Sequence, residues 1–195
     1  MKPKVLILNG SLGGPRGNTS VIVEKMTGLL VGKNEVDVLH LAEMGSIAGI
    51  ESNLRSASAF VFTTGTYWDS WGSPLQKFFE EATELEASDI WLGKPAAVIA
   101  TMHSVGGKEV VSRLQGVLSS LGLLLPPMTA MIYSLANHLA LKSGSEDPMA
   151  QDFWRLEDLE VVSTNLQTAV ECAQIQKPRW KTWPIDENDP RRRWL

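Results

Sequence analysis

Apolar and polar residues follow two different periods along this chain, and these periods divide most of it into strands and helices. Short apolar runs predict five strands, at residues 4–8, 35–41, 57–63, 95–101 and 123–133. The first, third and fourth runs are almost entirely apolar, which is typical of strands buried on both faces of a sheet. The second run alternates apolar and polar residues, as a strand nearer the edge does, and Pro126 and Pro127 interrupt the fifth.

Apolar residues at helical spacing lie between and after these strands. They predict helices at residues 21–30, 46–55, 73–86, 108–121 and 147–173. Pro74 suits the first turn of the third helix, and Gly122 suits the C-terminal cap of the fourth. The last helix is expected to bury one face, formed by Phe153, Leu156, Leu159, Val162, Leu166, Ala169 and Val170. Strands separated by helices predict an α/β fold, with a parallel sheet covered on both faces and right-handed crossovers.

The first loop, residues 10–20, has the composition of an anion site. It is rich in glycine, it begins a helix whose dipole favours negative charge, and Arg16 can add a charge-assisted contact. Hydroxyl and amide side chains add donors at Ser11, Asn18, Thr19 and Ser20. The spacing matches neither the nucleotide P-loop nor the dinucleotide-binding glycine pattern. A loop that only begins a helix, with an Asn or Thr cap, is the alternative interpretation.

Two further loops follow the third and fourth strands, and ligands of open parallel sheets bind at such carboxyl ends. The second loop, residues 64–72, carries Tyr67, Trp68 and Trp71, which favours a planar ligand. The alternative is that these aromatic rings cover the sheet or a subunit interface. The third loop, residues 102–107, ends in Gly106 and Gly107, whose N–H groups can hold a carbonyl oxygen or a developing negative charge.

Composition narrows the function classes. With 195 residues and 44% apolar content, the chain is expected to form one domain with a substantial core. A net charge of −4, with its basic cluster at residues 191–193, gives no support for a nucleic-acid partner. No apolar run suggests a membrane span or a signal peptide, so a cytoplasmic protein is expected. Cys172 is the single cysteine and is expected to be a core residue, and the spacing of the histidines predicts no metal site.

The three loops together resemble the NADPH-dependent FMN reductase family of the flavodoxin-like superfamily. The resemblance spans residues 3–135 and rests on Gly10-Ser11, Gly17-Asn18-Thr19, Thr66-Tyr67-Trp68, Ser73-Pro74-Leu75-Gln76-Lys77-Phe78 and Gly106-Gly107-Lys108-Glu109. It implies a flavodoxin-like, doubly wound three-layer sandwich with a five-stranded parallel sheet in the order 2-1-3-4-5. Residues 1–175 would form this FMN-binding domain, followed by a Trp/Arg-rich tail at residues 176–195. The resemblance also implies a homodimer or homotetramer.

The resemblance assigns roles to residues of all three loops. The FMN phosphate would contact Ser11, Arg16, Asn18, Thr19 and Ser20, and the isoalloxazine would contact Thr66, Tyr67, Trp68 and Asp69. Gly106 and Gly107 would face the N1 and O2 edge, and His103 and Ser104 would flank the pyrimidine and ribityl portions. The implied activity passes hydride from NADPH or NADH through flavin N5 to a quinone, a flavin or a similar small-molecule acceptor. The cofactor carries this chemistry, so no catalytic side chain is required.

Two other functions are consistent with the same fold. One is a flavodoxin-type electron carrier, although such a carrier is expected to be more acidic than −4. The other is a flavin-binding regulatory protein without turnover, because the fold does not determine the activity. The tail has two interpretations as well. In the first, it covers the flavin of a neighbouring subunit or binds the 2′-phosphate of NADPH; in the second, it packs on the surface or is a disordered end.

Overall fold

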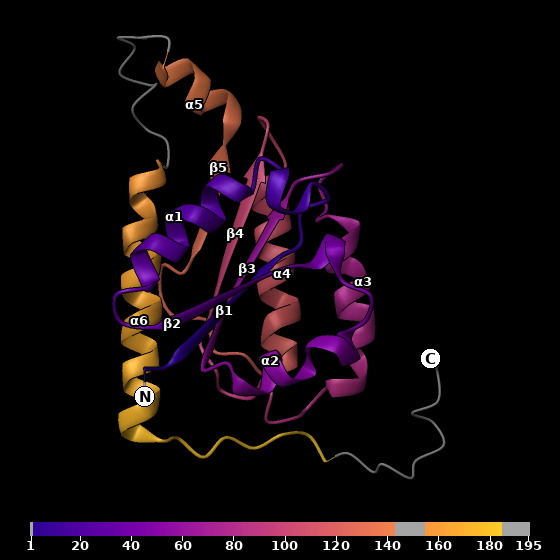
Figure 1. The fold of residues 1–195 in the computed structure, drawn as a ribbon, viewed down its shortest axis with the longest axis vertical. Helices are drawn as coiled ribbons and strands as arrows, with labels where there is room; N and C mark the ends of the chain where they lie inside the picture. Colours follow the sequence, from indigo (N-terminus) through magenta and orange to yellow (C-terminus); the bar gives the residue numbers. More distant parts are fainter. Residues whose placement is uncertain (1, 143–154, 185–195) are drawn as a thin grey trace.

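The computed structural model describes residues 2–142 and 155–184. Its centre is a parallel sheet in the order β2-β1-β3-β4-β5 (Figure 1). The strands are β1 (Lys4–Asn9), β2 (Glu35–His40), β3 (Ala59–Gly65), β4 (Ala96–Met102) and β5 (Ala130–Ser134). Both the parallel α/β fold and the strand order are confirmed.

Helices cover both faces of the sheet. One face is covered by α1 (Ser20–Leu30) and α6 (Leu159–Gln176), which pack against each other. The other face is covered by α2 (Glu51–Ser56), α3 (Ser73–Ala82) and α4 (Gly107–Leu121). A further helix, α5 (Leu135–Lys142), continues beyond the end of β5 (Figure 1). The sequence pattern did not predict α5.

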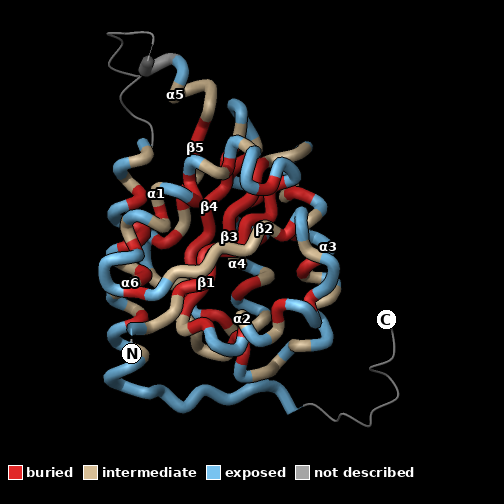
Figure 2. The backbone as a smooth tube through the Cα atoms, in the orientation of Figure 1, coloured by how far each residue is buried: buried red, intermediate tan, exposed pale blue. Residues whose placement is uncertain are grey.

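The core has two halves because neighbouring residues of a strand point to opposite faces. In β1, Leu6 and Leu8 belong to the half under α2, α3 and α4, whereas Val5 and Ile7 belong to the half under α1 and α6. Every residue of β3 is buried, while β2 is only partly buried (Figure 2). The sheet interior and the edge position of the second strand are therefore as predicted.

The fifth strand and the last helix differ from the prediction. Only Ala130–Ser134 forms β5, because the chain between the two prolines and β5 turns through Met128 at a φ of 57°. Residues 147–154 lie outside the described residues, and Phe153 with them. Arg155 is not helical and Leu156–Asp158 forms a 3₁₀ turn, so α6 begins at Leu159. The carboxylate of Asp158 accepts a hydrogen bond from the Arg155 N–H at 2.6 Å and thereby caps the 3₁₀ turn that precedes α6.

Within α6, the expected apolar face is buried at Leu159, Val162, Leu166 and Val170. The prediction for Cys172 is wrong, because its side chain is exposed. Two residues after Val170 correspond to about 200° around a helix, so Cys172 lies on the solvent side. Among the helices that the structure describes, none is long and apolar enough to span a bilayer.

Candidate functional site

The carboxyl ends of β1, β3 and β4 surround an open cavity of about 360 Å³, to which all three loops contribute. This volume lies within the range of about 300–1,000 Å³ that ligand pockets occupy. Arg16 is the one permanently charged side chain among the described lining residues, and no carboxylate lines the cavity there. The cavity is therefore suited to an anionic ligand.

The first loop folds back on itself through close contacts between backbone atoms. A Cβ atom at Gly13 would lie 2.6 Å from the Cα of Gly17, and one at Gly17 would lie 2.9 Å from the Ser11 hydroxyl. Gly14 has a φ of +51° and begins the 3₁₀ turn that carries Arg16. Glycine is required at Gly13 and Gly17 because the loop leaves no space for a side chain, and it is favoured at Gly14 by the left-handed φ.

At its end, the first loop presents the N-terminus of α1 to the cavity. The backbone N–H groups of Asn18 and Thr19 make no hydrogen bond to other described residues. The Thr19 hydroxyl is buried and lies 3.1 Å from the Thr101 hydroxyl of β4, which fixes the helix start against the sheet. Two free N–H groups at a helix N-terminus form an anion-binding arrangement.

The second loop contains a two-residue turn. The backbone groups of Tyr67 and Ser70 pair at 2.8 and 3.0 Å, and the two residues between them have left-handed φ angles, 50° for Trp68 and 58° for Asp69. Such a turn costs a tryptophan conformational energy of about 1–3 kcal/mol. Trp68 is fully exposed at the tip and does not line the cavity. By contrast, Thr66 lines the cavity, and its buried hydroxyl has no partner among the described residues.

The third loop meets the second at the start of α4. Gly106 has a φ of +87°, and a Cβ atom there would collide with the Asp69 carboxylate. Gly107 is buried, and a Cβ atom there would collide with Ile132 of β5. The left-handed φ of Gly106 and the close packing of Gly107 on β5 therefore explain both glycines without a ligand. His103 lines the cavity, and its carbonyl oxygen accepts hydrogen bonds from the Ser134 hydroxyl at 3.0 Å and from a backbone N–H of α5 at 2.9 Å.

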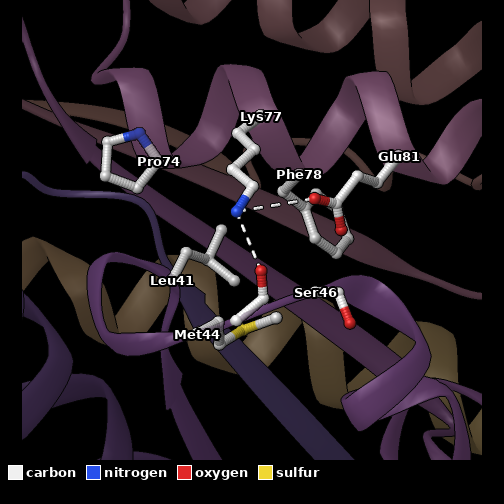
Figure 3. A pocket seen from close by; sticks show the side chains of 8 residues that line it. Leu41, Met44, Ser46, Pro74, Lys77, Phe78 and Glu81 are labelled. Atoms are coloured by element: carbon white, nitrogen blue, oxygen red, sulfur yellow. Dashed lines mark hydrogen bonds and ion pairs between the residues drawn. The ribbon is translucent and has the colours of Figure 1, made fainter.

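A second hollow, between α3 and the connection after β2, contains no comparable site (Figure 3). It holds about 10 Å³, roughly the space for one water molecule. The Lys77 ammonium group donates to the Gly45 carbonyl at 2.8 Å and lies 3.6 Å from the Glu81 carboxylate. Glu81 also accepts the Ile47 N–H at 2.5 Å. These polar side chains bind one another and the backbone, so they hold α3 against the segment that follows β2.

A family model described as NADPH-dependent FMN reductase matches residues 3–137. The chain belongs to this family. The resemblance inferred from residues 3–135 is thus confirmed, and the family supports flavin-dependent oxidoreduction. Among curated protein sequences, none matches this chain.

Solved structures with the same fold include other flavoproteins. RosB with the bound intermediate 8-demethyl-8-formylriboflavin-5′-phosphate has 16% sequence identity and a TM-score of 0.69, over 96% of this chain and 93% of that one. An oxidoreductase from Corynebacterium diphtheriae has 17% identity and a TM-score of 0.65, over 88% and 98%. FerB, a flavoenzyme NAD(P)H:(acceptor) oxidoreductase from Paracoccus denitrificans, has 18% identity and a TM-score of 0.65, over 89% and 98%. At these identities the likeness establishes the fold alone.

In this member of the FMN reductase family, the cavity brings together about half of the expected binding residues. Its lining includes Ser11, Arg16, Asn18, Thr19, Thr66, Tyr67 and His103. Six expected residues lie around the cavity without lining it: Ser20, Trp68, Asp69, Ser104, Gly106 and Gly107. Their assignment to flavin contacts stays a prediction.

Sequence reasoning missed several residues of the site. Thr101 and Met102 line the cavity from the end of β4, and Leu135 lines it from α5. Thr101 and Met102 could have been found from their place at the carboxyl end of a strand. Leu135 could not, because the sequence pattern did not predict the helix that carries it. Asn9, fully buried beneath the first loop, was also missed. Its signal is a polar residue at the end of an otherwise apolar run.

The described part of the tail lies far from this cavity. Residues 177–184 run along the amino ends of the strands (Figure 1). Trp180 packs directly on Gly93, just before β4, and is about half exposed. The described tail is thus exposed and contacts the surface through Trp180, and Arg191–Arg193 lie outside the described residues.

Proposed function

We propose that this chain is an NAD(P)H-dependent FMN oxidoreductase that transfers two electrons to a small-molecule acceptor such as a quinone or a flavin. The observation that carries the proposal is the composition of the cavity. Its lining combines the basic, glycine-rich first loop with the Thr66 hydroxyl, which has no partner, and no carboxylate of the described residues lines it. Membership of the FMN reductase family supports it.

The residues of the cavity fit FMN at its phosphate end. The free N–H groups of Asn18 and Thr19, the hydroxyl of Ser11 and the guanidinium of Arg16 would hold the phosphate. The positive end of the α1 dipole adds to this attraction. Together these groups would neutralise the phosphate charge, so they would discriminate FMN from riboflavin.

The other end of the cavity suits the polar edge of a planar ring. The Thr66 hydroxyl is buried without a partner, and such a group is stabilised by a ligand that hydrogen-bonds to it. Tyr67 packs over Gly65, where a Cβ atom would lie 3.0 Å from the tyrosine ring, and it forms an apolar wall. When bound, FMN supplies the hydride acceptance and two-electron delivery that the protein itself lacks.

The mouth of the cavity would bind the nicotinamide and the acceptor in turn. Each of the three loops exposes one large apolar side chain: Leu12, Trp68 and Val105, which are 52%, 101% and 74% exposed. A partly apolar molecule that binds at the mouth would contact these side chains and bury part of their apolar surface. This arrangement favours an aromatic acceptor over a charged protein partner.

The proposal is tested by the visible absorption spectrum of protein that is purified with added FMN, recorded before and after one equivalent of NADPH without oxygen. We expect bound flavin that bleaches on addition of NADPH. NADH is added in a parallel sample to define the donor. Flavin that stays oxidised would contradict the reductase proposal in favour of a carrier or a regulatory protein, and the absence of bound flavin would contradict the site.

We also propose that the chain forms a homodimer or homotetramer through α3 and α4. A groove of about 530 Å³ between these helices is lined by Trp71, Phe79, Val117 and Leu121. The acidic residues Glu80, Glu84 and Glu86 are exposed on α3 and directly after it, whereas Lys108 and Arg113 outnumber Glu109 among the exposed charges near the start of α4. A twofold axis across the helices would bring these opposite charges together. Sedimentation should show a dimer or tetramer that Val117→Glu dissociates, and a monomeric wild type would contradict it.

A further inference from the structure

The side-chain amide of Asn9 lies buried beneath the first loop, where it hydrogen-bonds to four different groups. Asn9 ends β1, and in the sheet register it lies between His40 of β2 and Thr63 of β3. The Asn9 Nδ2 atom lies 3.0 Å from the Gly14 carbonyl oxygen and 3.0 Å from His40 Nδ1. The Asn9 Oδ1 atom accepts the Ser11 N–H at 3.2 Å and the Thr63 hydroxyl at 3.3 Å. Both donor and both acceptor positions of the amide are therefore used.

The backbone determines which way this amide points. The Ser11 N–H can only donate and the Gly14 carbonyl can only accept, so Oδ1 must face Ser11 and Nδ2 must face Gly14. The second N–H of Nδ2 then points at His40, whose Nδ1 must accept it. The acceptor role of Nδ1 corresponds to the ring tautomer that carries its proton on Nε2.

The hydrogen bonds of the Asn9 amide position the part of the loop that lines the cavity. Ser11 lines the cavity directly, and Gly14 begins the turn that carries Arg16 into it. One buried amide thus holds both ends of the segment between Ser11 and Gly14. Because Asn9 is fully buried, a lost partner cannot be replaced by solvent at no cost.

We infer that Asn9 is a positioning residue for the anion-binding loop, and that His40, in its Nε2–H form, is the acceptor that keeps the Asn9 amide in place. His40 thus acts on the ligand through Asn9, from an edge strand and without touching the cavity. The identity of the anion as the FMN phosphate rests on the proposed function.

The binding test compares FMN with riboflavin, which differ by the phosphate. His40→Leu removes the acceptor, and we expect FMN to bind about tenfold more weakly while riboflavin binding is unchanged. His40→Asn offers an amide oxygen near the place of Nδ1, and we expect it to restore FMN affinity to within about threefold. Asp37→Asn on the same strand is the matched control and should leave both affinities unchanged.

The outcomes separate this inference from the proposed function. Equal losses for FMN and riboflavin, no rescue by His40→Asn, or no effect of His40→Leu would overturn the inference. If the wild type binds neither flavin, the proposed function fails, and a second measurement still decides the inference. In nitrogen–proton NMR correlations of the three histidines, His40 should show the Nε2–H form at neutral pH and change its tautomer balance in Asn9→Leu. A protonated or Nδ1–H ring in the wild type would overturn it.

Discussion

The two ends of the sheet differ in the polar groups that they leave without a partner. At the amino end, the Arg55 guanidinium binds the carboxylates of Glu51 at 2.7 Å and Asp89 at 2.9 Å. The Lys94 ammonium donates to the carbonyl of Arg55 at 3.2 Å and lies 5.7 Å from the centre of the Phe60 ring. At the carboxyl end, the Thr66 hydroxyl and two N–H groups at the start of α1 have no partner among the described residues.

This difference indicates which end stabilises the fold and which end is reserved for a ligand. Polar groups that pair within the protein contribute to its stability, whereas buried polar groups without partners cost stability until something binds to them. The amino end has one such group as well, the indole N–H of Trp91. Trp91 is packed among Phe60 and Phe78 rather than beside a cavity, so its orphaned N–H does not indicate a site.

The largest effect is expected from Gly13→Ala in the first loop. A Cβ atom at Gly13 would lie 2.6 Å from the Cα of Gly17, so the loop must open. FMN should bind about a hundredfold more weakly, as titration by flavin fluorescence would measure. Gly28→Ala, where a Cβ atom meets nothing within 4 Å, is the control and should bind FMN normally. Equal affinity in both variants would mean that the phosphate binds elsewhere.

A substitution at the opposite end should change stability instead of binding. Gly93 has a φ of +72° and carries Trp180 on its surface, so Gly93→Val strains the backbone and displaces the indole. The free energy of unfolding should fall by about 2 kcal/mol, as measured with urea. FMN affinity should be unchanged when the protein is folded. A loss of FMN binding in folded Gly93→Val would contradict the view that the amino end serves stability and the carboxyl end serves binding.

Thr66→Val tests the role of the unpartnered hydroxyl group by itself. The variant removes a buried hydroxyl that has no partner, so the flavin-free protein should be as stable as the wild type or more stable. FMN should nevertheless bind about tenfold more weakly, because the ring loses one hydrogen bond. Thermal unfolding with and without FMN measures both effects. A variant that is destabilised without FMN would show that the hydroxyl serves the fold.

The smallest effect concerns Lys94. Burial lowers the pKa of Lys94 to about 8, with Arg55 acting in the same direction and Asp89 opposing it. The folded protein therefore loses this proton more readily than the unfolded chain, whose lysine keeps its usual pKa of 10.5. The Lys94 contribution to stability should become more favourable as pH rises from about 8 to 10.5.

Since the Lys94 side chain is partly exposed, this gain should not exceed about 1 kcal/mol. The unfolding free energies of the wild type and Lys94→Met are compared at both ends of this pH interval, and the difference between the two proteins should change. A constant difference would show that the lysine titrates normally.

Sequence patterns determined most of the fold because burial dictates residue type in a parallel sheet. The runs around Val5–Leu8 and Ala96–Ala100 have no exposed face, so they could be located from hydrophobicity alone. The start of α6 could not, because the apolar spacing continues through Leu156, whereas the chain forms a 3₁₀ turn at Leu156–Asp158 before α6 begins. The strand order came from the family resemblance and not from any local pattern.

At the site, residue type was a better guide to the loops than to individual contacts. The glycines and hydroxyls of the first loop do lie at the cavity, where close backbone approach requires glycine and an anion requires hydrogen-bond donors. Gly107 shows the limit of this reasoning: its lack of a side chain is explained by contact with Ile132. Asn9 shows the converse: its place as a polar residue at the end of an apolar run could have been noticed, but its role beneath the loop is recognised only from its four partners.

The most direct test of the account is hydrogen exchange of backbone amides, measured by mass spectrometry with and without FMN. The account predicts slower exchange in residues 10–20, 64–72 and 102–107 when FMN is present. Residues 88–95 and 177–184, at the opposite end of the sheet, should exchange at the same rate in both samples. Protection that is confined to those amino-end segments, or that is absent everywhere, would contradict a flavin site at the carboxyl ends of β1, β3 and β4.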